Sequence, residues 1–126
     1  MRYLLMASLI VVGIIHLLPA IGVLGPERLE TLYRVTLTDP GLVVLMRHRA
    51  ILFGLLGSYL VLAAFVPALQ LSALVMALLS VVSFLGLALS SGPVSPAIAR
   101  IVAVDWVALA AVAVGFVAYA LLRRQA

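Results

Sequence analysis

The sequence contains no cysteine and no lysine, and it has only four acidic residues. Without cysteine, disulfides, thiolate catalysis and cysteine-ligated metals are excluded. All eight cationic side chains are arginines, and they are scattered rather than gathered into a basic patch. Because nucleic-acid binding needs such a patch, we expect no nucleic-acid partner.

Charge of either sign is absent from Ala50 to Ala99, a run of fifty residues without Asp, Glu, Lys, Arg or His. Soluble domains carry about 25% charged residues, whereas this chain carries 10%, is 67% hydrophobic and has a mean hydropathy of +1.36. Such a run cannot form the surface of a water-soluble domain. We therefore predict a multi-pass integral membrane protein with one transmembrane domain, residues 1–126.

Four apolar runs are long enough to cross a bilayer, which takes about 20 helical residues. They cover residues 3–20, 40–66, 69–89 and 96–122. The runs lack the period-2 alternation of strands, so the predicted fold is all-α, a membrane four-helix bundle with a tight turn near residues 67–70. The first run follows Arg2 as in a signal peptide, but no small-residue cleavage site follows, and we expect it to remain as a span.

Residues 26–36 differ from the spans because polar and apolar side chains alternate there at helical spacing. Pro26 opens the segment, and Glu27 and Glu30 lie in its first turns. One face carries Leu29, Leu32 and Tyr33. The pattern predicts a short amphipathic helix between the first two spans, lying on the bilayer surface or capping the bundle as a lid. Tyr33 is then either an interface-belt residue or a ligand contact.

Charged residues of the second and fourth spans occur at matching depths. Arg49 lies nine residues after Pro40, and Asp105 lies nine residues after Pro96. Proline is favoured at the first helical position, and both helices begin on the same side of the membrane. We therefore expect Asp105 to pair with Arg49, or alternatively with Arg47 or His48. A charged residue at membrane depth costs roughly 2.5–3.5 kcal/mol on insertion scales, so a partner is needed.

Other polar side chains fall in the same layer. The predicted ligand-binding layer consists of His16, Arg47, His48, Arg49, Ser83 and Asp105. His16, His48 and Asp105 are the candidate acids and bases, and water or a ligand head group should complete the hydrogen bonds of the layer. Arg100, five residues before Asp105, is expected on another face, where its side chain extends to lipid headgroups. The alternative reading is an ion pair that only fixes helix packing.

Small residues predict the packing faces of the helices. On the third span, one arc carries Ser72, Met76, Ser80, Ser83, Gly86 and Ser90. The second span offers Ala50, Gly54 and Ser58, and the fourth offers Ala108, Ala111, Gly115 and Ala118. We expect these stripes to face neighbouring helices.

The early helix with Gly13 and His16, the Pro-Glu amphipathic segment, and the motif RAILFGLLG at residues 49–57 together resemble the DoxX-like superfamily. That superfamily comprises small bacterial four-helix membrane proteins, and the resemblance covers nearly the whole chain. It implies a bacterial inner-membrane location. It also implies a lipophilic or quinone-type ligand, or an accessory role beside a redox enzyme.

The sequence leaves several functions open. The favoured one is binding of a quinone-type or lipid molecule at the polar layer, with membrane lipid, a second copy or a larger membrane complex as partners. The alternatives are an intramembrane acid/base enzyme, such as an isomerase or a quinone-linked oxidoreductase component, and a structural subunit. A b-type haem held axially by His16 and His48 is a further alternative. Membrane orientation also stays open, with cytoplasmic termini slightly favoured.

Overall fold

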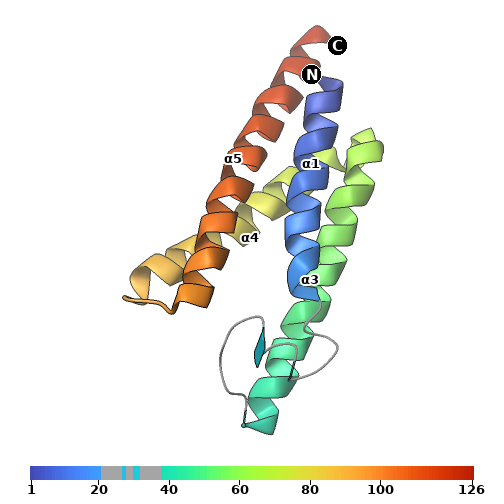
Figure 1. Ribbon diagram of the computed structural model, residues 1–126. Coiled ribbons are helices and arrows are strands. Elements are labelled where there is room, and N and C mark those ends of the chain that lie inside the picture. Colours follow the sequence, from blue (N-terminus) through green and yellow to red (C-terminus); the bar gives the residue numbers. More distant parts are fainter. Residues whose placement is uncertain (21–26, 28–29, 32–37) are drawn as a thin grey trace.

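The computed structural model describes residues 1–20, 27, 30–31 and 38–126, and these residues are almost entirely helical (Figure 1). The main elements are α1 (Arg2–Leu17), α3 (Pro40–Phe65), the 3-10 turn η2 (Pro67–Leu69), α4 (Gln70–Ser90) and α5 (Pro96–Gln125). The all-α class and the four long helices are confirmed, and within the described part there is no strand. Both termini lie at the same end of the molecule.

Local sequence signals explain where the helices begin and end. The Asp39 side chain accepts the Gly41 N–H at 2.9 Å, and Ser95 accepts the Ile98 N–H at 3.3 Å. These side chains satisfy backbone donors that a helix start leaves free. Val66 is extended because it precedes a proline, and α3 therefore ends at Phe65. At the far end, α5 continues beyond the predicted residue 122 to Gln125.

The predicted amphipathic segment, residues 26–36, falls mostly outside the described residues. Within it, Glu27, Glu30 and Thr31 are helical, and the Thr31 hydroxyl donates to the Glu27 carbonyl at 2.8 Å. Leu29, Leu32 and Tyr33 lie outside the described residues, and so does the predicted lid.

Helix α1 lies between α3 and α5 and packs against both of them. Among the described elements, no Cα atom of α3 lies within 8 Å of one of α5, but Val43 and Met46 of α3 belong to the same apolar cluster as Ile98 and Ile101 of α5. Helix α4 crosses obliquely in Figure 1 and packs against α5 and α3, with only a slight contact to α1. The centre of the core is formed by Leu5, Leu9, Val12, Leu60, Leu74 and Val112, which are all buried.

A close helix contact joins α1 and α3 at two glycines. A Cβ atom built on Gly57 would lie 2.8 Å from the Gly13 carbonyl oxygen and 2.7 Å from Leu17 Cγ. A Cβ on Gly13 would lie 3.0 Å from the Gly57 carbonyl oxygen. The two backbones therefore touch directly, which only glycine allows.

The predicted packing faces are correct for one helix and wrong for another. On α5, Ala108, Gly115 and Ala118 are buried as expected. On α4, the expected stripe is mostly exposed, and the buried face instead consists of Gln70, Ala73, Leu74, Ala77, Val81 and Leu85. The hydroxyls of Ser83 and Ser90 donate to carbonyls of their own helix and need no neighbour. Ser72 and Ser80 do contact neighbouring helices, through the Tyr59 hydroxyl of α3 and His16 of α1. On α3, Ala50 is buried, but Ser58 is exposed and Gly57 makes the close contact.

Large apolar side chains are exposed on every one of the four helices. Examples are Tyr3 on α1, Leu55 on α3, Leu79 on α4 and Val107 on α5. Each of the four helices is long and apolar enough to cross a membrane. Soluble monomers rarely expose apolar surface on this scale.

The glycine contact generates a stability prediction. Gly57→Ala should destabilise the protein by about 1–3 kcal/mol, because the new methyl group meets the Gly13 backbone, which cannot move aside as a flexible side chain can. Thermal unfolding in detergent should show a melting temperature lowered by several degrees. Gly86→Ala on α4 is the matched control, since no atom lies within 4 Å of a Cβ there. Equal melting temperatures of the two variants would contradict the backbone contact.

Candidate functional site

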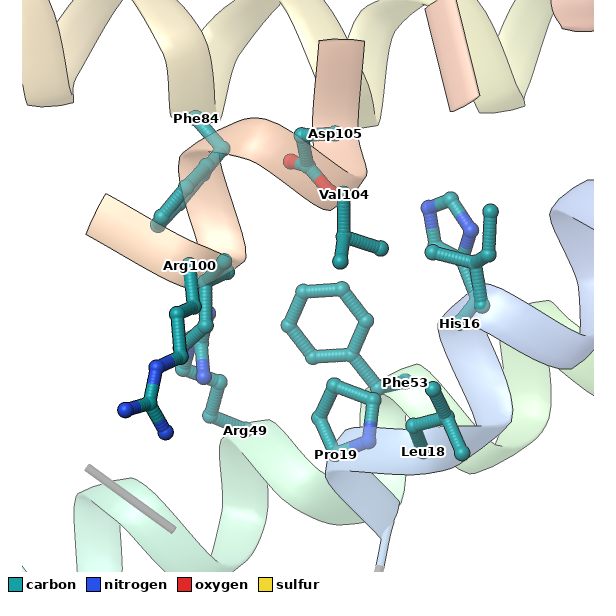
Figure 2. Close-up of a pocket in the computed structure, with 11 residues that line it drawn as sticks. His16, Leu18, Pro19, Arg49, Phe53, Phe84, Arg100, Val104 and Asp105 are labelled. Carbon is teal, nitrogen blue, oxygen red and sulfur yellow. The ribbon is translucent and has the colours of Figure 1, made fainter. Parts of the chain in front are cut away.

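A cavity of about 200 Å³ lies at the end of α1, between α3 and α5, with Phe84 of α4 on its wall (Figure 2). Its apolar lining includes Ile15, Leu18, Pro19, Phe53, Phe84, Ile101 and Val104. The polar side chains that line it are His16, Arg49, Arg100 and Asp105. The cavity thus brings together side chains from all four helices, mostly apolar with a few charged groups.

His16 is anchored within the helix bundle, with only 3% of its surface exposed. Its Nδ1 lies 2.8 Å from the Val12 carbonyl oxygen, and its Nε2 lies 3.0 Å from Ser80 Oγ. Because a carbonyl only accepts, Nδ1 carries the hydrogen, and in the neutral ring Nε2 accepts the Ser80 hydroxyl hydrogen. Both ring nitrogens are therefore used, and the bond to Ser80 ties α1 to α4.

The Phe53 ring lies between His16 and Arg49. Its centroid is 5.7 Å from that of the His16 ring, with 35° between the ring planes. On the other side, Arg49 Cζ lies 4.5 Å from the Phe53 centroid, a cation–π contact. Figure 2 shows the phenyl ring in the middle of the cavity lining, with both arginines on one side and His16 on the other. Phe53 thus presents an aromatic surface to the cavity.

Asp105 is the acidic side chain of the cavity, and it is half-buried. It interacts electrostatically with Arg49. The described part of the chain provides no hydrogen bond and no ion pair within 4.0 Å to this carboxyl group. The expected direct pair with Arg49 is therefore a longer-range electrostatic attraction.

The structure brings together three members of the predicted layer, His16, Arg49 and Asp105, around one cavity. Arg47 and His48 are exposed and do not line it, because neighbouring helical residues point about 100° apart. Ser83 is also exposed, and its hydroxyl donates to the Ser80 carbonyl at 2.9 Å. The structure therefore corrects the predicted placement of Arg47, His48 and Ser83, which do not line the cavity. Tyr33 lies outside the described residues. Whether the cavity binds a ligand stays a prediction.

Three residues of the site were missed by the sequence reasoning. Ser80 was counted among the packing residues of α4 and instead holds His16. Phe53 follows Arg49 by four residues, the spacing at which helical side chains meet, and this was a usable signal. Arg100 was expected to extend away, yet it lines the cavity together with Asp105.

The geometry does not support a haem held by both histidines. The Nε2 atom of His16 is hydrogen-bonded to Ser80, and His48 is exposed and outside the cavity lining. Across the described ranges, no three His, Cys, Asp or Glu side chains are grouped to hold a metal ion.

Comparisons with protein-family models, with curated protein sequences and with solved structures find no match for this chain. The resemblance to the DoxX-like superfamily rests on the sequence features given above. Function is accordingly inferred from the geometry of the cavity, since fold alone does not determine it.

The His16–Ser80 bond generates a prediction for α4. Ser80→Ala should destabilise the protein by about 1–3 kcal/mol, because the buried Nε2 atom of His16 loses its partner. Ser83→Ala is the matched control on the same helix, and it should change stability by less than about 0.5 kcal/mol, since its hydroxyl is exposed. Thermal unfolding of both variants in detergent checks this. Indistinguishable effects would show that the bond contributes nothing.

Proposed function

We propose that this chain is an integral membrane protein whose cavity binds the polar head of a lipophilic small molecule, with a quinone-type head as the favoured chemistry. The observation that carries the proposal is an apolar, ring-sized cavity whose lining residues include Arg49, Arg100 and Asp105. Binding sites for small molecules are typically apolar with a few convergent polar groups.

Support for membrane integration comes from the distribution of apolar and charged side chains. Each of the four helices is long and apolar enough to span a bilayer, and each exposes large apolar residues. The cationic residues Arg2, Arg123 and Arg124 lie near the two termini, which share one end of the molecule. The cavity and its arginines lie toward the other end, so an uncharged middle section is flanked by cations, as a bilayer requires.

Support for a ring-shaped head group comes from the size and lining of the cavity. An engineered apolar protein cavity of about 150 Å³ is known to bind benzene, and this cavity measures about 200 Å³. A planar ring can pack edge-to-face against Phe53, and ring oxygens can accept hydrogen bonds from Arg49 or Arg100. An apolar tail attached to the ring would follow the exposed helix surfaces into the bilayer.

The wider role that we propose is that of an accessory subunit in a redox complex of the bacterial inner membrane. This part of the proposal draws on the resemblance to the DoxX-like superfamily and on the quinone-type chemistry of the cavity. Either a second copy or another membrane subunit would then cover part of the exposed apolar surface.

Membrane integration predicts a simple fractionation result. The expressed full-length chain should stay in the membrane pellet after an alkaline carbonate wash and should be released by detergent, because its four apolar helices hold it in the bilayer. Immunoblotting of both fractions measures this. Release by carbonate alone would contradict membrane integration and would indicate that the protein is only peripherally associated with the membrane.

Ligand binding predicts an effect of filling the cavity. Val104→Phe should lower the amount of lipophilic compound that copurifies with the protein by roughly 5- to 100-fold, because the larger side chain occupies the cavity. Lipid extraction of the purified protein followed by mass spectrometry measures the retained compound.

The matched control is Val114→Phe. Val104 and Val114 both lie on α5 and are 40% and 41% exposed, but Val114 does not line the cavity. The control should retain the compound at the level of the unmodified protein. Equal retention by both variants, or no retained compound beyond bulk membrane lipid in any sample, would argue against the cavity as a binding site.

A further inference from the structure

The Asp105 carboxyl group has no hydrogen-bond donor within the part of the chain that the structure describes, and it is half-buried beside apolar side chains. Its oxygens remain accessible, since the described residues hold no buried side-chain oxygen or nitrogen that lacks a partner. The neutral donors of the site are engaged elsewhere. The Nδ1–H of His16 bonds to Val12, and the Ser80 hydroxyl bonds to His16. A molecule that enters the cavity can therefore supply a donor to Asp105.

The charges around the cavity limit which chemical groups could bind there and donate to Asp105. A ligand with an ammonium group would be repelled by Arg49 and Arg100, which both line the cavity. An anionic or purely accepting head could use the arginines, but it has no hydrogen to donate to the Asp105 carboxylate, and an anion would also be repelled by that group. A neutral hydroxyl group meets both conditions, because its hydrogen can be donated to a carboxylate while its oxygen accepts from a guanidinium.

The aromatic side chain in the lining further limits the kind of ligand that fits the cavity. The Phe53 ring forms part of the cavity wall, held between the imidazole of His16 and the guanidinium of Arg49. Both neighbours restrain the phenyl ring and cover its faces, so its edge is the part that can meet a flat group in an edge-to-face contact. In the view of Figure 2, the Val104 side chain lies between Asp105 and the Phe53 ring, and all three residues line the cavity. A ring that packs against the edge of Phe53 can therefore turn a substituent toward Asp105.

We propose that the cavity selects an uncharged hydroxylated ring on an apolar tail, and that its hydroxyl group donates to the Asp105 carboxylate. This inference rests on the proposed function and adds a specificity-determining residue to it. For a quinone-type molecule, the proposal means that the reduced, hydroxyl-bearing form binds more tightly than the oxidised form, whose oxygens only accept. For other lipids, it predicts preference for phenol-like heads over their ethers.

The test compares 4-nonylphenol with its methyl ether, which has the same ring and tail but no donor. Binding to the purified full-length protein is measured by equilibrium dialysis in detergent at about pH 8, where carboxylates are ionised and phenols are neutral. Each affinity is corrected for the partition of the probe into detergent alone. The phenol should bind roughly 10- to 100-fold more tightly than the ether, as expected for a hydrogen bond to a charged acceptor.

Variants then locate the acceptor. Asp105→Leu should bring the ratio of the two affinities close to one while binding of the ether persists. Asp105→Asn keeps the shape of the side chain and should lower the ratio several-fold, which gives a reading if the leucine variant does not fold. Asp39→Asn is the control, because Asp39 is an exposed helix cap outside the cavity and asparagine caps equally well.

The outcomes separate this inference from the proposed function. Equal affinities for phenol and ether in the unmodified protein would overturn the inference and leave the binding function standing. A preference that persists in both Asp105 variants would overturn the assignment of Asp105. Binding of neither probe would overturn the proposed function together with the inference.

Discussion

The backbone contact between Gly13 and Gly57 decides where α1 lies against α3, and the cavity depends on that placement. Helix α1 has 16 residues, whereas α3 has 26 and α5 has 30. At 1.5 Å per residue, both neighbours therefore extend well beyond the end of α1. The backbones of α3 and α5 pack against α1 and do not approach each other closely, which leaves space for a cavity beyond the end of α1. The side chains at the end of a short helix thus become the wall of a cavity.

The two titratable groups that α1 and α5 bring to this cavity differ in how they are satisfied. His16 has a partner at each ring nitrogen and ties α1 to α4, two helices that otherwise make little contact. Its role is therefore explained by the fold. Among the described residues, Asp105 has only the more distant attraction of Arg49. Its carboxyl oxygens stay accessible, because no buried side-chain oxygen or nitrogen in this part of the chain lacks a partner. This contrast is why the functional argument centres on Asp105 rather than on the histidine.

Much of the fold could be predicted because charge-free runs and N1 prolines set the number and direction of the helices. Arg49 and Asp105 were placed at one level because depth follows from counting residues along two helices that begin on the same side. Ser83 does not line the cavity as predicted, and the contact of Ser80 with His16 was not predicted. The reason is that the rotation of α4 about its axis depends on its oblique crossing, which composition does not encode. Serine is a poor guide to that rotation, since its hydroxyl can bond to its own helix and face outward. Arg100 lines the cavity although it is exposed, because the stem of a long side chain can cover apolar surface while its charged head points away.

The rim of the cavity bears on how a ligand would reach Asp105. Leu18 and Val104 both line the cavity and remain exposed, at 59% and 40%. In a bilayer these side chains would face lipid, so one side of the cavity borders the hydrocarbon. A water-soluble ligand gains nothing from such a rim, because it would lose hydration before it met a polar group. A lipophilic molecule exchanges lipid contacts for similar protein contacts on the way in, and it meets the charged groups only when its head arrives. A single site can therefore combine entry from the membrane with recognition by a few polar groups.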